Sequence, residues 1–202
     1  MNAQDILNSD DFKQCQAFHG HLCPGLSIGY KASKLAMARL EEVRAADEEV
    51  VAVVETDACS ADAVQVLTGC TFGKGNFLYR DHGKMALTLF SRNSGRGLRV
   101  LVKPGAFEPD PEHRELLQKV MQGSADAEER KRFQKLHFQR SCDVLEMPDD
   151  QLFLLEEVQE EMPAKARIEP SEPCSRCGET AMRSKLEMVD GQAVCRACLS
   201  VI

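Results

Sequence analysis

The chain has 202 residues, of which 43% are hydrophobic and 28% charged, a composition typical of a globular protein with one sizeable core and a small additional unit. Its formal net charge of −7 disfavours nucleic-acid binding through a basic surface, and no apolar run approaches the roughly 18 residues that cross a bilayer. The acidic N-terminus is unlike a signal peptide, so the nine cysteines indicate a reducing, cytoplasmic location, where they bind metal or react rather than form disulfides.

The first half of the chain is predicted to alternate between helices and strands, because apolar residues recur at helical spacing in some segments and run continuously in others. In chain order we expect helices over 11–18 and 25–45, a strand over 50–54, a helix over 61–69, and strands over 76–80, 85–91 and 98–102. Turn-forming residues at 81–84 and 93–97 separate the last three strands, which is typical of an antiparallel meander.

The second half predicts two charged helices and then a bent strand, over 112–123, 126–141 and 153–168. A linker that contains two prolines follows from 168 to 173. The fold class is therefore α+β, in which helices and strands are mixed at first and then segregate. We expect a mixed helix and antiparallel-sheet core and a small treble-clef-like zinc ribbon, over residues 1–168 and 169–202.

Three metal-binding side chains lie within five positions of the chain, at His19, His21 and Cys23. The next two residues, Pro24 and Gly25, are predicted to open the long helix, so Cys23 lies at a helix N-terminus. Unpaired backbone N–H groups and the helix dipole favour a thiolate at such a position. The His-x-His-x-Cys spacing therefore favours a metal or catalytic site over isolated buried side chains.

Two further cysteines lie in loops of the same region, one after the predicted buried strand and one in a glycine-rich loop, and two chemistries are open if these loops share a cleft. The first is a transition-metal site formed by His19, His21, Cys23, Cys59 and Cys70. The second is a thiolate nucleophile assisted by histidine, with Cys59 and Cys23 as the catalytic candidates. Further candidates for contacting a cofactor or an anionic ligand are Asp57, Lys74 and Lys84.

Four cysteines near the C-terminus form the pattern Cys-x2-Cys-x17-Cys-x2-Cys, at Cys174, Cys177, Cys195 and Cys198. Each Cys-x2-Cys directs two sulfurs at one point, and four thiolates suit tetrahedral zinc. A unit of about thirty residues contains almost no core, so the metal must supply most of the folding free energy. Because all four positions are protein ligands, this zinc is expected to be structural.

Four segments form an ordered set of motifs, namely FHGHLCPG at 18–25, ETDAC at 55–59, DAVQVLTGCTFGKGN at 62–76 and DHGK at 81–84. Together they resemble the family of the formylmethanofuran dehydrogenase E subunit (FmdE), in the version that carries a C-terminal zinc ribbon. The resemblance covers roughly residues 12–168. It implies an FmdE-like α+β core, dimerisation, and a cleft that bears metal-binding or thiol groups at His19, His21, Cys23, Cys59 and Cys70.

The resemblance also implies an association with molybdenum or tungsten formylmethanofuran dehydrogenase, which reduces CO₂ onto a C1 carrier and in which FmdE is not the catalytic component. Three functions follow as hypotheses. The first is a zinc-containing accessory protein of molybdenum/tungsten or C1 metabolism whose cleft binds a metal or small ligand. The second is an enzyme that uses a cleft metal or cysteine on a small acyl or anionic substrate. The third is a homodimeric binding module that recruits a protein partner through the ribbon, with no membrane or nucleic-acid partner expected.

Overall fold

The structure, a computed structural model, describes residues 2–108 and 110–199. The chain divides into two compact units, Met1–Lys165 and Ala166–Ile202. The helices of the first unit are α1 (Ala3–Asn8), α2 (Asp10–His19), α3 (Pro24–Leu40), α4 (Ser60–Thr68), α5 (Pro111–Met121), α6 (Ala127–Glu146) and α7 (Asp149–Leu152). Its strands are β1 (Val50–Val54), β2 (Phe77–Tyr79), β3 (Ala86–Ser91), β4 (Gly97–Val102) and β5 (Phe153–Glu157).

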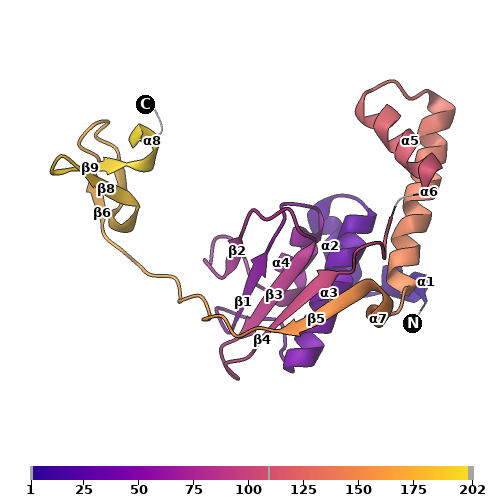
Figure 1. Cartoon of the computed structure of the whole chain (residues 1–202), viewed down its shortest axis with the longest axis horizontal. Coiled ribbons are helices and arrows are strands. Elements are labelled where there is room, and N and C mark those ends of the chain that lie inside the picture. Colours follow the sequence, from indigo (N-terminus) through magenta and orange to yellow (C-terminus); the bar gives the residue numbers. More distant parts are fainter. Residues whose placement is uncertain (1, 109, 200–202) are drawn as a thin grey trace. The chain divides into compact units, whose positions relative to one another are not determined.

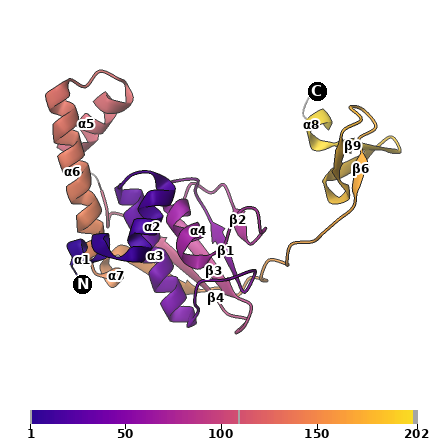
Figure 2. The same cartoon turned by 180° about the vertical axis from the view of Figure 1, so that it is seen from behind.

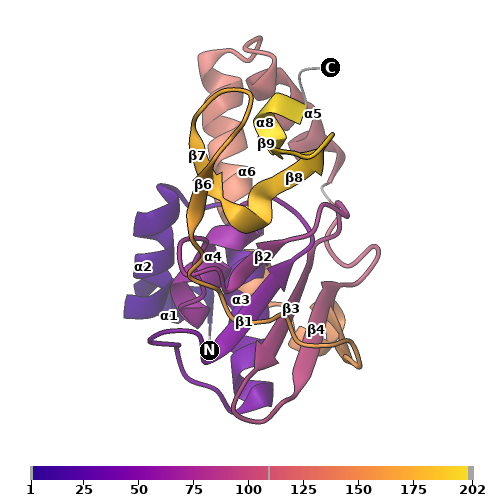
Figure 3. The ribbon, with the colours of Figure 1, turned by 90° about the vertical axis from the view of Figure 1, so that its left-hand side faces the viewer.

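A five-stranded sheet with the strand order β2-β1-β3-β4-β5 forms the frame of the first unit (Figure 3). β1 and β2 are parallel, and the other neighbouring strands are antiparallel. Helices α2, α3 and α4 lie on one face of the sheet (Figures 1 and 2). All five residues of β1 are buried, with Val50, Ala52 and Val54 in the cluster that includes α3 and with Val51 and Val53 in a separate cluster. The α+β prediction is confirmed, and the continuous apolar run marks a strand covered on both faces.

The predicted meander is wrong in its first connection, because β1 lies between β2 and β3. The backbone N–H of Arg80 donates to the carbonyl of Val54, and the N–H of Lys84 donates to the carbonyl of Glu55. Residues 80–85 therefore cross the end of β1 instead of forming a tight hairpin turn. The turn-forming residues at 81–84 indicate a change of direction, but they do not determine which strand the chain pairs with next.

Helix α3 ends earlier than the predicted range of 25–45. Glu41 adopts a left-handed backbone conformation, with φ of 58°, and caps the helix after Leu40. Val43, whose helical spacing suggested a continuation, lies beyond this cap and is exposed. An apolar residue after a helix end thus extended the predicted helix falsely.

Other boundaries also differ from the prediction. The polar N-terminus forms α1, capped by the side chain of Asn2, and α6 continues beyond 141 to Glu146. The strand predicted over 153–168 stops at Glu157, because the chain then leaves the sheet edge and Val158 packs against the second face of the sheet. These differences arise from tertiary contacts that local spacing does not record.

Helices α5 and α6 form a hairpin, and α5 with the start of α6 projects beyond the sheet (Figure 1). The rings of His113, Phe133 and His137 stack between the two helices, with centroids 4.9 to 5.4 Å apart. The second half of α6 packs on α3 and α1. The aromatic residues predicted to face the core or a partner therefore partly join the two helices.

The second unit consists of short elements, namely β6 (Ser171–Pro173), β7 (Thr180–Met182), a 3-10 turn (Arg183–Lys185), β8 (Leu186–Val189), β9 (Gln192–Cys195) and α8 (Arg196–Leu199). β6 pairs with β7 and β8 pairs with β9, both antiparallel. Residues 171–173, predicted as linker, thus belong to the unit. The predicted Asp-Gly turn is present, since Asp190 and Gly191 both have positive φ, as a two-residue hairpin turn of this type requires.

Candidate metal centre

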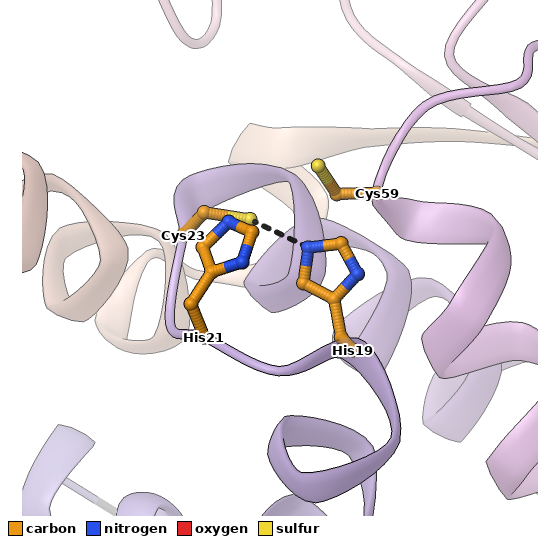
Figure 4. A group of neighbouring side chains, drawn as sticks. All are labelled: His19, His21, Cys23 and Cys59. Atoms are coloured by element: carbon orange, nitrogen blue, oxygen red, sulfur yellow. Dashed lines mark hydrogen bonds between the residues drawn. The ribbon is translucent and has the colours of Figure 1, made fainter.

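Four metal-binding side chains from two distant segments meet in the first unit. The ligand atoms of His19, His21, Cys23 and Cys59 all lie within 4.8 Å of one another (Figure 4). His19 is the last residue of α2, Cys23 is the N-cap of α3, and Cys59 is the N-cap of α4. The predicted convergence of the two loops is therefore present in the structure.

The local sequence explains how the first three residues come together. Gly20 adopts a left-handed conformation, with φ of 92°, which ends α2 and turns the chain back. Cys23 then caps α3, because its Sγ accepts a hydrogen bond from the backbone N–H of Leu26 at 3.3 Å. Pro24 occupies the first turn of α3, where its missing N–H leaves no bond unmade.

Two glycines bring Cys59 into the group. A Cβ atom at Gly25 would lie 3.1 Å from the Cβ of Cys59, and one at Gly29 would lie 2.3 Å from the carbonyl oxygen of Ser60. Only glycine at these two positions, one helical turn apart, allows the start of α4 to pack directly against the backbone of α3. The close approach of the two helices therefore positions the sulfurs of Cys23 and Cys59.

His19 is oriented by a carboxylate. Its Nδ1 lies 2.7 Å from Oδ2 of Asp62 in α4, and its Nε2 lies 3.7 Å from Sγ of Cys23 (Figure 4). The rings of His19 and His21 lie 4.3 Å apart between centroids. A carboxylate that accepts from the outer ring nitrogen is the usual support of a metal-binding histidine, because it fixes the tautomer and the ring plane.

Burial raises the pKa of the Cys23 thiol to about 11, and hydrogen bonds from the N–H groups of Leu26 and Gly25 only partly oppose this effect. The expected thiolate at the helix N-terminus is thus outweighed by the loss of solvation. A bound cation reverses this balance, since a coordinating thiol is deprotonated outright. The environment of Cys23 therefore suits a metal ligand better than a free nucleophile.

The four donors make a two-nitrogen, two-sulfur set that fits a tetrahedral transition metal. Such an ion, with bonds of about 2.0–2.3 Å, holds its donor atoms about 3.3–3.8 Å apart. The pair formed by His19 Nε2 and Cys23 Sγ already has this spacing. Cys23 is buried, His19 and Cys59 are half-buried and His21 is exposed. Of the four ligands, His21 is consequently the one that solvent or a small molecule can most easily replace.

Cys70 does not join this group. It is fully buried in the core next to β1, and its Sγ donates to the carbonyl of Val50 at 3.4 Å. The sequence places Cys70 in a motif with Cys59, but the short helix between them directs the two side chains into different hydrophobic clusters. Its inclusion among the metal ligands is therefore not supported by the structure.

The three predicted ligand-contacting residues have separate positions. Asp57 and Lys84 are exposed, and Asp57 is not among the grouped metal-binding atoms. Lys74 donates from Nζ to the backbone carbonyls of Ala46 and Asp47, which are 3.4 and 2.9 Å away. Lys74 thus holds a loop, and a role for any of the three in ligand binding stays a prediction.

Asp62, Gly25 and Gly29 are the site residues whose roles the sequence reasoning did not recognise. Asp62 lies three positions after Cys59 in the predicted helix, but a supporting carboxylate has no spacing rule of its own. Gly25 and Gly29 share one face of a helical pattern, and this was the available signal, because glycines one turn apart permit close helix contact.

The second unit contains the other group of metal-binding atoms. The sulfurs of Cys174, Cys177, Cys195 and Cys198 lie within 4.8 Å of one another, as the Cys-x2-Cys pairs predict. Hydrogen bonds from the backbone N–H groups of Cys195, Cys177 and Arg176 lower the pKa of the Cys174 thiol to about 6. This group is consistent with a zinc ribbon, in which backbone donors support the thiolate ligands.

Among the described residues, no helix is both long and apolar enough to pass through a bilayer. This finding agrees with the hydropathy of the sequence.

Comparison with known proteins gives three matches. The model of the FmdE family, described as "FmdE, Molybdenum formylmethanofuran dehydrogenase operon", matches residues 18–154. A protein of Archaeoglobus fulgidus named "Probable S-adenosyl-L-methionine-binding protein" is 33% identical over 192 residues, which cover 92% of this chain. The chain spans about half (51%) of the length of that relative.

A solved structure has the same fold. It is that of an FmdE-like protein of tungsten formylmethanofuran dehydrogenase from Syntrophus aciditrophicus, with a TM-score of 0.62 and 24% sequence identity. The match covers 98% of this chain and 91% of the other. The family model covers more than half of the chain and includes all four residues of the candidate metal centre. The chain therefore belongs to the FmdE family.

Proposed function

We propose that this protein is an accessory protein of molybdenum/tungsten or C1 metabolism that holds two metal ions. One is a structural zinc in the second unit. The other is a transition-metal ion in the first unit, bound by His19, His21, Cys23 and Cys59. The observation that carries the proposal is the meeting of these four donors, supported by the carboxylate of Asp62.

The chemistry of the donor set favours zinc, iron or nickel, since imidazole and thiolate bind most late first-row metals. An ion at this position supplies Lewis acidity toward a carbonyl or a water molecule. His21 is the exposed ligand, so a small molecule that reaches the ion from solvent would take its place. Cys23 and Cys59 belong to the metal-binding set, and a metal-independent nucleophilic role is less well supported because burial keeps Cys23 protonated.

The metal content of the purified full chain tests this proposal. We expect two ions per chain for the wild type, one for Cys59→Ala and one for Cys177→Ala, by inductively coupled plasma mass spectrometry. Cys70→Ala is the matched control and should keep two ions, because its thiol lies in the core. A wild type with one ion per chain that survives Cys59→Ala and is lost in Cys177→Ala would contradict the core metal.

A second candidate function is the binding of S-adenosyl-L-methionine. It is supported by the printed name of the relative from Archaeoglobus fulgidus and by the 33% identity that extends over 92% of this chain. Isothermal titration of the metal-loaded chain with S-adenosyl-L-methionine tests it. Saturable heat that is lost in Cys59→Ala would place the ligand at the metal centre, and the absence of saturable heat would remove this candidate.

Assembly belongs to the proposal as well. The family resemblance implies a homodimer, and the accessory role implies a protein partner such as a molybdenum or tungsten enzyme. Light scattering coupled to gel filtration, on the full chain and on residues 1–165, measures the first. A monomer for both forms would exclude the dimer, whereas a dimer for the full chain alone would assign it to the second unit.

A further inference from the structure

The sulfurs of Cys23 and Cys59 are directed at the same point. Both belong to the group of ligand atoms within 4.8 Å of one another. A Cβ atom at Gly25 would lie 3.9 Å from the Sγ of Cys23 and 3.8 Å from the Sγ of Cys59, so the glycine leaves the space between the two thiols open. A disulfide needs sulfurs about 2.05 Å apart, which rotations of two side chains on adjacent helix ends can provide.

The two thiols differ in their access to solvent. Cys23 is 4% exposed, whereas Cys59 is half-buried and lies on the side of the group that reactants reach. An oxidant from solvent therefore meets Cys59 first, and Cys23 is placed as the resolving thiol behind it. His19 Nε2 lies 3.7 Å from the Sγ of Cys23 and is placed to accept its proton.

We propose that Cys23 and Cys59 form a redox pair, which hydrogen peroxide converts into an intramolecular disulfide when no metal is bound. In the first step the sulfur of Cys59 attacks peroxide, the O–O bond breaks, and sulfenic acid and one water form. In the second step the sulfur of Cys23 attacks the sulfenic sulfur, the S–O bond breaks, and the hydroxide leaves as water with the proton of Cys23. Two thiols are oxidised and one peroxide is reduced to two waters.

Metal binding and oxidation exclude each other at this position, since the disulfide removes both thiolate donors. The centre would thus release or refuse its ion under oxidising conditions and recover it on reduction. This consequence rests on the proposed core metal, but the disulfide itself requires only the geometry of the two thiols.

Peptide mapping of the metal-free full chain tests the redox pair. The chain is treated with one equivalent of hydrogen peroxide, blocked with N-ethylmaleimide, digested with trypsin and examined by mass spectrometry. Trypsin yields a peptide 14–31, with Cys15 and Cys23, and a peptide 45–74, with Cys59 and Cys70. We expect the two peptides to be linked, and the link to disappear on treatment with dithiothreitol.

Single variants and fragmentation assign the link. Cys15→Ala and Cys70→Ala are the matched controls, because both thiols are fully buried, and each should keep the link. Cys23→Ala and Cys59→Ala should abolish it, and fragmentation of the linked wild-type peptides should assign the bond to Cys23 and Cys59 directly.

Two results would overturn the inference: unlinked peptides with Cys59 recovered as sulfinic acid, or a link that persists in Cys59→Ala. Metal analysis separates this inference from the proposed function. A link that forms in a chain without core metal removes the metal and keeps the redox pair. A chain that binds two ions but gives no link does the reverse.

Discussion

The carboxylate of Asp62 lies 2.7 Å from Nδ1 of His19 and leaves Nε2 as the nitrogen that faces Cys23. Asp62→Asn keeps the size of the side chain but removes the charge that holds this tautomer. We expect the affinity for the core metal to fall about 10- to 100-fold, as for other supporting carboxylates of metal-binding histidines. Competition with a chromogenic chelator measures it. Asp57→Asn, an exposed neighbour in sequence, is the control, and equal affinities for the two variants would contradict the role of Asp62.

Gly25→Ala should separate the two halves of the centre. The added methyl group would lie 3.1 Å from the Cβ of Cys59, so the start of α4 must move away from α3. We expect loss of the core ion with the zinc of the second unit retained, measured as one ion per chain. Gly73→Ala is the matched control, because a Cβ there meets no atom within 4 Å. Two ions in Gly25→Ala would show that the approach of the helices is not limiting.

Gly29→Ala should affect stability more than binding. A Cβ at this position would lie 2.3 Å from a backbone oxygen of Ser60, which cannot move as a side chain can. Overpacking of this kind destabilises by about 1–3 kcal/mol, and somewhat more where backbone must shift. Urea unfolding of the metal-free chain gives the difference in free energy, and a variant as stable as the wild type would mean that α3 and α4 are not packed as described.

The second unit should depend on its metal for folding. Cys177→Ser removes one of four sulfurs, and a unit with so few buried residues has little else to stabilise it. We expect rapid proteolysis within 166–202 and an unchanged thermal midpoint for the first unit. Mass spectrometry of the digest and a parallel melting curve measure both effects. A protected C-terminal unit in this variant would refute the structural role of the metal.

Acid stability should report on Asp11. Its burial, which opposes charge, is outweighed by hydrogen bonds from Lys34, Ser9 and Tyr30, and these lower its pKa from 3.8 to about 2. The charged form is thus favoured in the folded state, so its stabilisation is present above about pH 4 and is lost as the pH falls toward 2. Asp11→Asn should be less stable than the wild type at pH 6, with the difference shrinking below pH 4. Exposed Asp10→Asn is the control, and parallel curves for wild type and Asp11→Asn would contradict the prediction.

Much of the centre follows from sequence because its positions are set by local rules. The Pro-Gly pair after Cys23 predicts a helix start, and the apolar run before Cys59 predicts a strand that ends at a helix. Both expectations hold in the structure, and together they bring the four donors close. The motifs that resemble the family lie in the same segments, and the family is now established.

The parts that could not be predicted depend on long-range pairing. The place of β1 between β2 and β3 is decided by contacts between strands distant in sequence, and the turn at 81–84 carries no information about them. Cys70 resembles Cys59 in residue type and in its loop position, but the carbonyl of Val50 and the surrounding core take it up. A residue's motif membership thus does not separate a ligand from a core thiol.

Gly25 and Gly29 place the ends of two helices in contact, although the whole of α3 and β1 separates Cys23 from Cys59 in the chain. An ion bound by both cysteines would close that long loop and lower the entropy of the unfolded chain, as any cross-link of this span does. Loading with metal would then speed the refolding of the first unit, because the slow search that joins α3 to α4 would start from a tethered chain.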